Sequence, residues 1–269
     1  AYVYSQATLL DHYKRIEAAF APLNPLICYS VKSCGNLAVC RTLARAGAGM
    51  DVVSGGEIFR ARQAGAPPES IVYAGVGKSD DEIRQALREK IYLLNVESEA
   101  EFENIARIAR ELNATCDCAL RVNPDVDPKT HRYTSTGRKE TKFGVDIERA
   151  RAFFRTYGRD AHARLRGIHL HIGSPIYSVE PYVQAVTKAL ALRAELAQEG
   201  YTVEVLDIGG GFGADYETGR SPDAAAYAAA IVPLLLPAVQ AGMRVVLEPG
   251  RAIVANAGIL LTRVQYLKR

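Results

Sequence analysis

Residues 92–122 read YLLNVESEAEFENIARIARELNATCDCALRV, and this stretch decides the fold. Short apolar runs at Tyr92–Val96 and Cys118–Val122 flank the longer segment Glu99–Leu112. In that segment Phe102, Ile105, Ala106 and Ala109 recur three or four positions apart, which predicts an amphipathic helix with one buried face. A helix between two strands allows a crossover, so the stretch predicts a parallel strand–helix–strand unit.

The same unit recurs along the 269 residues. The eight candidate strands are Leu26–Val31, Met50–Val53, Ile71–Ala74, Tyr92–Val96, Cys118–Val122, Gly167–His171, Val203–Ile208 and Val245–Glu248. The helices expected between them are Leu37–Arg45, Glu57–Gln63, Asp80–Arg88, Glu99–Leu112, Ile147–Tyr157, Val179–Gln198 and Asp223–Gln240, with a first helix at Leu9–Phe20. Eight such units fit a closed barrel of roughly 250 residues better than an open sheet. We therefore expect an α/β protein, a (β/α)₈ TIM-type barrel over residues 1–256, followed at 257–269 by a strand (Ala257–Leu267) that leaves the barrel.

The composition excludes several classes of protein. Apolar residues make up 48% and charged residues 23%, as in ordinary globular chains. The net charge of +3 is spread without runs of like charge, so neither nucleic acid nor a membrane surface is indicated as a partner. The most apolar run, 224–239, is interrupted by two prolines and is too short to span a bilayer. Five cysteines without framework spacing, and a start without signal-peptide character, predict a cytoplasmic protein.

Polar and ionisable residues gather where the candidate strands end. In (β/α)₈ barrels the carboxyl ends of the strands form the active site, so this distribution predicts one converging site. The residues are Lys32, Asp51, Ser54, Glu57, Asn95, Glu97, Arg121, Asn123, His169, His171, Ser174, Gly209, Gly210, Gly211, Glu248, Gly250 and Arg251. The irregular segment Asn123–Phe143 is long for a compact domain and is expected to be a functional loop.

Two features at these ends have more than one interpretation. Lys32 would be partly desolvated in a barrel mouth, which lowers the pKa of the amine as a Schiff-base lysine requires; alternatively it extends to water. The glycines of Gly209–Gly213 could let backbone N–H groups approach a phosphate. They also match a dinucleotide-binding fingerprint through Ala214, although a polar loop separates them from the next helix, and they could simply form a tight turn.

Glu248 and the histidines also leave alternatives open. Glu248 could keep a proton on the ring nitrogen of a cofactor, or it could pair with Arg251 or another arginine at the barrel mouth. His169 and His171 share one strand face and could ligate a metal, but no third ligand is evident, so we expect no metal. Ring stacking by His171 and a core position for His169 are the preferred interpretations.

A family resemblance rests on motifs that occur in order along nearly the whole chain. They are Tyr29-Ser-Val-Lys32, Asp51-Val-Val-Ser-Gly-Gly-Glu57, Arg121-Val-Asn-Pro, Lys142-Phe-Gly144, His171-Ile-Gly-Ser174, Gly209-Gly-Gly211 and Glu248-Pro-Gly-Arg251. The sequence resembles the barrel domain of the pyridoxal-phosphate-dependent ornithine/diaminopimelate decarboxylase family. Gly75-Val-Gly-Lys78 and Asn95-Val-Glu-Ser98 are closest to its diaminopimelate branch, whereas Pro175 stands where that branch usually has glutamine.

The resemblance implies roles for individual residues around pyridoxal 5′-phosphate. Lys32 would carry the cofactor covalently, His171 would stack on its ring, and Glu248 would contact the ring nitrogen. The phosphate would be held by Ser174, Gly209, Gly210 and Gly211, and by the backbone of Pro249, Gly250 and Arg251. Asp51, Glu57 and Arg121 would line the cofactor pocket, and Arg251 is also a candidate for binding the substrate carboxylate.

The implied activity is decarboxylation of meso-2,6-diaminopimelate to L-lysine and CO₂. A carboxylate at Glu248 favours decarboxylation over racemisation, because it keeps the ring nitrogen protonated and the ring an electron sink. The resemblance also implies an amino-acid substrate and a homodimer whose shared active sites are completed by a C-terminal β-domain. The alternatives are decarboxylation of another basic amino acid or a carboxylated polyamine, a non-catalytic cofactor-binding relative, and a sugar-phosphate barrel without this cofactor.

Overall fold

The computed structural model describes residues 1–127, 143–216 and 221–268. The strands are β1 (Tyr2–Tyr4), β2 (Leu26–Ser30), β3 (Gly49–Val52), β4 (Ile71–Tyr73), β5 (Leu93–Val96), β6 (Cys116–Asn123), β7 (Val145–Asp146), β8 (Ala163–His169), β9 (Val205–Asp207), β10 (Arg244–Leu247) and β11 (Gly258–Leu260). The α-helices are α1 (Gln6–Phe20), α2 (Leu37–Arg45), α3 (Gly55–Ala64), α4 (Asp80–Glu89), α5 (Glu99–Glu111), α6 (Ile147–Tyr157), α7 (Glu180–Gln198), α8 (Ala224–Gln240) and α9 (Arg251–Val254). Short 3₁₀ turns are η1 (Ala21–Leu23), η2 (Val31–Ser33) and η3 (Pro68–Ser70). Of the predicted loop Asn123–Phe143, residues 128–142 lie outside the described part.

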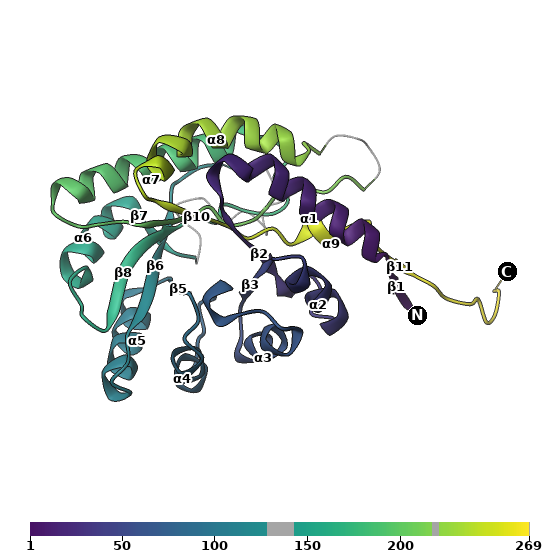
Figure 1. Ribbon diagram of the computed structural model, residues 1–269, viewed down its shortest axis with the longest axis horizontal. Coiled ribbons are helices and arrows are strands. Elements are labelled where there is room, and N and C mark those ends of the chain that lie inside the picture. The colour runs from purple at the N-terminus through teal and green to yellow at the C-terminus, as the bar shows by residue number, and fades with distance from the viewer. Residues whose placement is uncertain (128–142, 217–220, 269) are drawn as a thin grey trace.

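Eight parallel strands form a closed ring. The order is β2-β3-β4-β5-β6-β8-β9-β10, and β10 pairs with β2 through Val246 opposite Leu26 and Leu247 opposite Ile27. Figure 1 shows the helices α2 to α8 arranged around the outside of these strands. The predicted (β/α)₈ barrel is therefore confirmed, and each predicted strand coincides with a ring strand to within a few residues.

The helices begin where side chains can cap their first turns. The hydroxyl of Ser98 accepts the backbone N–H of Glu101 at 3.3 Å and starts α5. Ser54, Ser79, Asp146 and Asp223 cap α3, α4, α6 and α8 in the same way. Within α5, the apolar residues predicted to face the core are buried. No helix in the described ranges combines the length and hydropathy needed to cross a bilayer.

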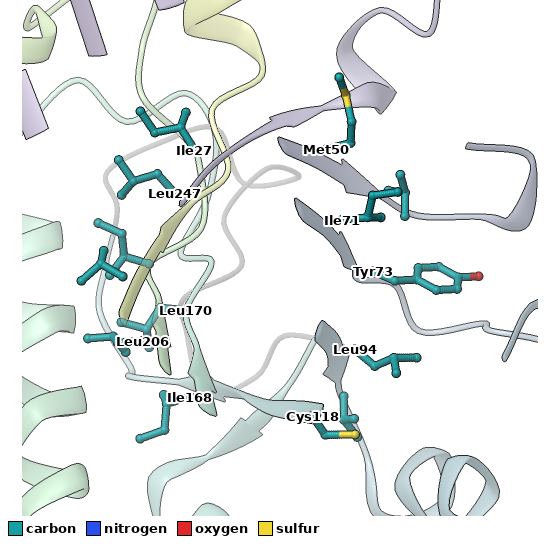
Figure 2. Packing of buried hydrophobic residues seen from close by; sticks show 14 of the residues in the cluster. Ile27, Met50, Ile71, Tyr73, Leu94, Cys118, Ile168, Leu170, Leu206 and Leu247 are labelled. Atoms are coloured by element: carbon teal, nitrogen blue, oxygen red, sulfur yellow. The ribbon is translucent and has the colours of Figure 1, made fainter. Parts of the chain in front are cut away.

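Side chains alternate between the two faces of the ring. Outward-facing residues such as Met50, Ile71, Leu94 and Leu206 pack in the layer between strands and helices, as Figure 2 shows. A separate cluster of buried residues consists of Cys28, Val72, Leu93, Ala119, Val205 and Val246, each from a different strand of the ring. This set, the apolar plug, fills the barrel interior, because a barrel of eight strands is packed with side chains rather than open.

The strand expected at Ala257–Leu267 is much shorter than predicted. Only β11 is a strand, and it pairs antiparallel with β1, Tyr4 lying opposite Gly258 and Tyr2 opposite Leu260. A strand requires a partner for its backbone groups, and the partner of β11 is a segment more than 250 residues away in the sequence. The apolar alternation from 261 to 267 predicted extended structure without indicating that partner, and these side chains are exposed. The boundary at residue 256 stays a prediction.

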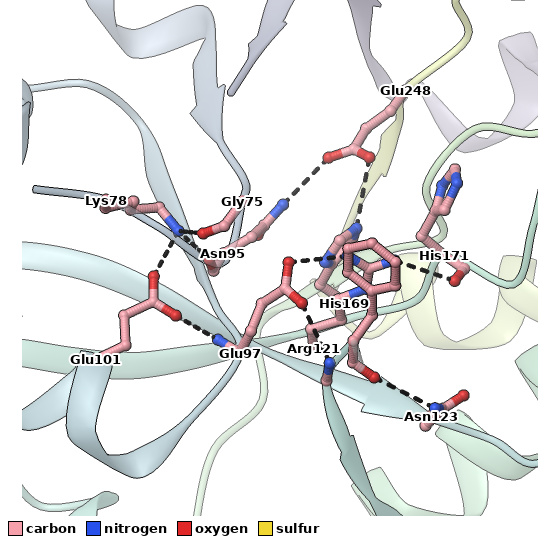
Figure 3. A network of polar contacts seen from close by, with 12 residues as sticks. Gly75, Lys78, Asn95, Glu97, Glu101, Arg121, Asn123, His169, His171 and Glu248 are labelled. Carbon is pink, nitrogen blue, oxygen red and sulfur yellow. Dashed lines mark hydrogen bonds and ion pairs between the residues drawn. The ribbon is translucent and has the colours of Figure 1, made fainter. Parts of the chain in front are cut away.

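The ends of β4 and β5 are tied to α5 by a buried ion pair (Figure 3). Nζ of Lys78 lies 2.5 Å from Oε1 of Glu101, and the two side chains are 1% and 10% exposed. Lys78 also donates to the carbonyl oxygens of Gly75 and Asn95, at 2.8 and 2.7 Å. The other oxygen of Glu101 accepts the N–H of Glu97 at 2.7 Å. One lysine thus joins the carboxyl ends of two neighbouring strands to the helix α5.

We expect Lys78→Met to destabilise the barrel strongly, because it leaves Glu101 buried without its cation. Removing one partner of a buried pair costs about 3–5 kcal/mol. The measurement is the free energy of unfolding in urea, and Arg107→Met serves as control because Arg107 pairs with Glu111 on the exposed surface. The double variant Lys78→Met/Glu101→Leu should recover part of the loss. If Lys78→Met and Arg107→Met lowered the free energy of unfolding equally, this prediction would be contradicted.

Candidate active site

Above the apolar plug, the ring turns polar at the carboxyl ends of its strands. The buried polar residues there are Ser30 of β2, Asp51 of β3, Asn95 of β5, Arg121 and Asn123 of β6, His169 of β8, Asp207 of β9 and, directly after β5 and β10, Glu97 and Glu248. The parallel direction of all ring strands brings these residues to one end of the barrel. Seven of the residues predicted at the strand ends lie in this layer: Asp51, Asn95, Glu97, Arg121, Asn123, His169 and Glu248.

Lys32 lies at the rim of that layer, in η2 directly after β2. Its Nζ donates to Oδ2 of Asp51 at 2.8 Å, and its side chain is 46% exposed whereas Asp51 is fully buried. The hydroxyl of Ser30 donates to the same carboxylate. The amine therefore lies between the polar interior and the opening, with a fixed counter-ion on the neighbouring strand.

The expectation of a lowered pKa for Lys32 is wrong. Burial does lower the pKa of this amine, but the negative charges of Asp51 and Glu248 outweigh that effect, and the net shift is upward. Burial and the charge of Glu248 in turn raise the pKa of Asp51 to about 6. At neutral pH the pair is therefore predominantly ammonium and carboxylate. The sequence motif indicated the lysine but not the acid on the next strand.

Arg121 is held on the opposite side of the ring by a second buried acid. Its Nη1 lies 2.8 Å from Oε1 of Glu97, and the two side chains are 9% and 3% exposed. Its guanidinium lies over the ring of Phe143 at 4.7 Å, and Nη2 donates to the carbonyl oxygen of His171 at 3.4 Å (Figure 3). Arg121 thus fixes the backbone that carries His171.

His171 follows β8 and is half-buried. Burial, followed by the positive charges of Arg121 and Lys32, lowers the pKa of its imidazole well below the ordinary value. The ring is therefore neutral at physiological pH. The backbone N–H of Gly210 donates to its Nδ1 at 3.4 Å, so the glycine loop and the imidazole are in contact.

The glycines after β9 are required by close backbone packing. A Cβ on Gly210 would lie 2.1 Å from the carbonyl oxygen of Glu248, and one on Gly209, where φ is +68°, would lie 2.2 Å from that of Leu170. The hydroxyl of Tyr182 on α7 donates to the carbonyl of Gly210 at 2.8 Å. The next helix, α8, begins only at Ala224, so these glycines do not open a helix as a dinucleotide fingerprint requires.

The segment after β10 bends back over β2. The N–H of Ser30 donates to the carbonyl of Pro249 at 3.2 Å, and a Cβ on Gly250 would lie 2.8 Å from that of Ser30. Arg251 donates to the hydroxyl of Tyr216 at 2.7 Å and to Ser174 at 3.4 Å. In the described part of the chain, Arg251 forms no ion pair with Glu248, which was the alternative interpretation of that acid.

Glu57 makes a local contact at the start of α3. Its Oε2 accepts the N–H of Val53 at 2.9 Å, and its own N–H donates to the hydroxyl of Ser54. Burial raises the pKa of this carboxyl. The structure therefore places Glu57 where it holds the turn between β3 and α3, on the side of the ring that carries Lys32 and Asp51.

Asp207 was missed by sequence reasoning. It is fully buried, and its polar atoms and those of His169 and Glu248 lie within 4.8 Å of one another. An acid inside the apolar run Val203–Ile208 was the available signal. Although this spacing would also suit a cation, the side-chain amide of Asn95 already donates to both carboxyls. His171 is not in the cluster, and the expectation of no metal stays a prediction.

Comparison with known proteins places this barrel in a family. Residues 6–255 match the family "Pyridoxal-dependent decarboxylase, pyridoxal binding domain", and the chain belongs to it. Its fold and sequence are those of the pyridoxal-binding domain that this family describes.

Two relatives and one solved structure are similar over almost the whole chain. Diaminopimelate decarboxylases of Aquifex aeolicus and of Neisseria meningitidis serogroup A are 44% and 43% identical over 99% of this chain. The crystal structure of diaminopimelate decarboxylase from Helicobacter pylori complexed with L-lysine is 38% identical over 96% of this chain, with a TM-score of 0.91. The chain spans 63%, 65% and 64% of the lengths of these three proteins.

The chain's own chemistry fits pyridoxal phosphate. An amine that can attach an aldehyde lies at the same end of the ring as a buried acid able to face a ring nitrogen, and a glycine loop lies between them in chain order. Oδ1 of the buried Asp51 has no hydrogen-bond partner among the described residues, so the layer retains acceptor capacity toward a bound group.

We expect Asp51→Asn to lower the pKa of Lys32, because its nearest negative charge is removed while its burial persists. The pH dependence of Lys32 acetylation by acetic anhydride, followed by peptide mass spectrometry, should move down by about 1–3 pH units. Asp80→Asn is a matched control on the surface, where Asp80 pairs with Arg107. An unchanged profile would show that Asp51 does not set the protonation of this amine.

Proposed function

We propose that this chain is the cofactor-binding barrel of a decarboxylase that converts meso-2,6-diaminopimelate to L-lysine and CO₂. The observation that carries the proposal is that two groups of opposite charge lie at the same end of the ring: the Lys32 amine at the rim and the buried carboxylate of Glu248. Bound pyridoxal phosphate supplies an electron sink for the electron pair left at Cα when CO₂ departs.

Glu248 keeps that sink effective. Its carboxylate favours the protonated form of a neighbouring ring nitrogen, as an opposite charge does for any base. Burial would raise the pKa of Glu248, but His169 and Lys32 outweigh burial and the net shift is downward, so the group remains a carboxylate at neutral pH. An arginine in this place would weaken the sink, so a carboxylate supports decarboxylation over racemisation.

Lys32 would hold the cofactor covalently, through a bond between its Nζ and the aldehyde carbon of the cofactor. Asp51 keeps the amine oriented and takes part in its proton balance, since the two groups are in contact and both have shifted pKa values. His171 presents a neutral imidazole for stacking on the pyridine ring. Arg121 positions His171 through its carbonyl, and Glu57 holds the turn beyond Asp51.

The phosphate is held by backbone and small side chains. The loop Gly209, Gly210 and Gly211 would hold it, together with the hydroxyl of Ser174 and the backbone of Pro249–Arg251 at the start of α9. In this structure the N–H of Gly209 donates to Asp207 and that of Gly210 to His171. Arg251 already contacts Ser174, so its guanidinium can serve either the phosphate or the substrate carboxylate.

Support for the substrate comes from the relatives. Those cited above are diaminopimelate decarboxylases, and the Helicobacter pylori structure is complexed with L-lysine. By the same resemblance, the full-length protein is proposed to be a cytoplasmic homodimer that completes its sites with residues beyond this chain.

Covalent attachment is tested by borohydride reduction of the full-length protein in the presence of pyridoxal phosphate. We expect mass spectrometry to find the phosphopyridoxyl adduct on the peptide that contains Lys32, because reduction fixes the carbon–nitrogen bond. Lys32→Ala should abolish this adduct, whereas Lys14→Ala, a change at an exposed helix position, should retain it. An adduct that survives in Lys32→Ala would refute the assignment.

Substrate and chemistry are tested by measuring CO₂ release from a panel of diaminopimelate, lysine, ornithine, arginine and a carboxylated polyamine. We expect turnover of diaminopimelate with formation of L-lysine. Glu248→Gln should lower kcat on the order of 10²–10³-fold, the effect of removing one preorganised electrostatic contact. Turnover of another panel member in place of diaminopimelate would refute the proposed substrate and would not affect the proposed cofactor.

A further inference from the structure

Three ionisable side chains meet, buried, at the base of the candidate site. His169 on β8, Asp207 on β9 and Glu248 after β10 come from neighbouring strands, and their polar atoms lie within 4.8 Å of one another. The proposed function uses Glu248 but gives no role to Asp207. Two carboxylates this close in a water-poor interior repel each other, and sharing one proton relieves the repulsion.

The contacts divide unequally between the two acids. Oε2 of Glu248 faces Nε2 of His169 at 3.4 Å, while Oε1 accepts the side-chain amide of Asn95 at 3.1 Å. The same amide reaches Oδ2 of Asp207 at 3.2 Å. Oδ1 of Asp207 accepts the backbone N–H of Gly209 at 2.8 Å. The imidazole therefore contacts Glu248, and the environment favours a negative charge there over one on Asp207.

The direction of each pKa agrees with this division. Burial, followed by the charge of Glu248, raises the pKa of Asp207 well above its ordinary value. Burial acts in the same direction on Glu248, but the charges of His169 and Lys32 and a hydrogen bond with Asp207 lower its pKa overall. Other titratable or charged groups interact electrostatically with these three residues or with the groups beside them. Among the described residues they include Cys28 of β2, Asp51 of β3, Arg121 of β6 and His171 after β8.

We propose that Asp207 is a positioning residue that remains an uncharged acid and holds Glu248, by the proton that it donates, as the single anion presented to the ring nitrogen. The inference rests on the proposed contact between Glu248 and that nitrogen. Asp207 does not touch the cofactor and acts through Glu248.

The backbone around Asp207 supports a positioning role. Asp207 anchors Gly209 by accepting its N–H, and the carbonyl of Gly209 accepts the N–H of Glu248 at 2.8 Å. Gly209 thus links Asp207 to Glu248 through two hydrogen bonds, and the polar side-chain atoms of the two acids lie within 4.8 Å. The orientation of Glu248 is therefore coupled to the position of Gly209, the first glycine of the loop.

The test compares Asp207→Asn with Asp207→Ala in the full-length protein that contains this chain. Asparagine is uncharged, can accept from Gly209 and can donate to Glu248, whereas alanine can do neither. Asp117→Asn is the matched control, because Asp117 pairs with Arg164 and Arg166 at the opposite end of the barrel. The probes are pyridoxal phosphate and an analogue in which CH replaces the ring nitrogen, and the readout is the dissociation constant of each.

We expect the loss of one hydrogen bond to a charged group in Asp207→Ala to weaken binding of pyridoxal phosphate by about 10- to 100-fold. Binding of the analogue should change little, because it has no nitrogen for Glu248 to contact. Asp207→Asn should stay within about threefold of the unaltered protein for both probes, since a neutral donor is retained. The pH at which the absorbance of bound pyridoxal phosphate changes should shift in Asp207→Ala and not in Asp207→Asn.

A second measurement needs no cofactor and no activity. Infrared spectra of the cofactor-free protein should contain the carbonyl band of a buried protonated carboxyl near neutral pH, and Asp207→Asn should remove it. Persistence of the band in Asp207→Asn would overturn the proposal even if the alanine variant failed to fold.

The remaining outcomes also decide the matter. Equal weakening by asparagine and alanine would show that Asp207 acts as an anion, and equal weakening of both probes by alanine would show a purely structural role; either result overturns the proposal. If the unaltered protein bound both probes equally, the proposed contact of Glu248 with the ring nitrogen would be refuted. The proposed role of Asp207, which depends on that contact, would be refuted as well. A different substrate in the CO₂ assay would leave all of these measurements unaffected.

Discussion

The pairing of the first ring strand with the last is the constraint on which the site depends. Val246 and Leu247 of β10 lie opposite Leu26 and Ile27 of β2, and this parallel register closes the eight strands. Closure brings the residues after β2 beside those after β10, so Lys32 and Glu248, more than 200 positions apart in sequence, act on one volume. Since every ring strand points the same way, the polar residues at their carboxyl ends have one place to gather.

The ring interior is divided along the barrel axis into two regions with different tasks. The apolar plug, from Cys28 to Val246, excludes water and packs like any core. Above it, buried acids and bases occupy a space where unpaired charge is costly, and the cations face acids on other strands, Lys32 facing Asp51 and Arg121 facing Glu97. The aromatic residues Tyr182, Phe212 and Tyr227 pack against one another below the glycine loop, with ring centroids 4.7 to 5.6 Å apart. The loop is thereby held from the helix side as well as by its own backbone.

The protonation state of each group in the polar layer depends on the charges of its neighbours. Lys32 is more basic than an isolated desolvated amine because Asp51 and Glu248 face it, and Glu248 is more acidic than an isolated buried carboxyl because His169 and Lys32 face it. Neither residue has its protonation set by its own burial. The barrel thus holds the Lys32 ammonium against Asp51, a neutral imidazole at His171 and the Glu248 carboxylate within one polar layer. Attachment of an aldehyde requires the ammonium to lose its proton first, and the carboxylate of Asp51 lies in contact with it.

The alternation of strands and helices, the number of ring strands and most of the residues at the strand ends could be predicted from the sequence. They follow from the period of apolar side chains and from the capping residues, which are local properties of the chain. α2 and α6 agree with their predicted bounds, and the glycines of 209–211 were recognisable as a motif after a predicted strand. Three features could not be read from the sequence: Asp51 faces Lys32, Asp207 lies beside Glu248 and His169, and the strand after residue 256 pairs with β1. These are contacts between distant segments, and their effects on pKa and on strand length depend on distances that come into existence only when the ring closes.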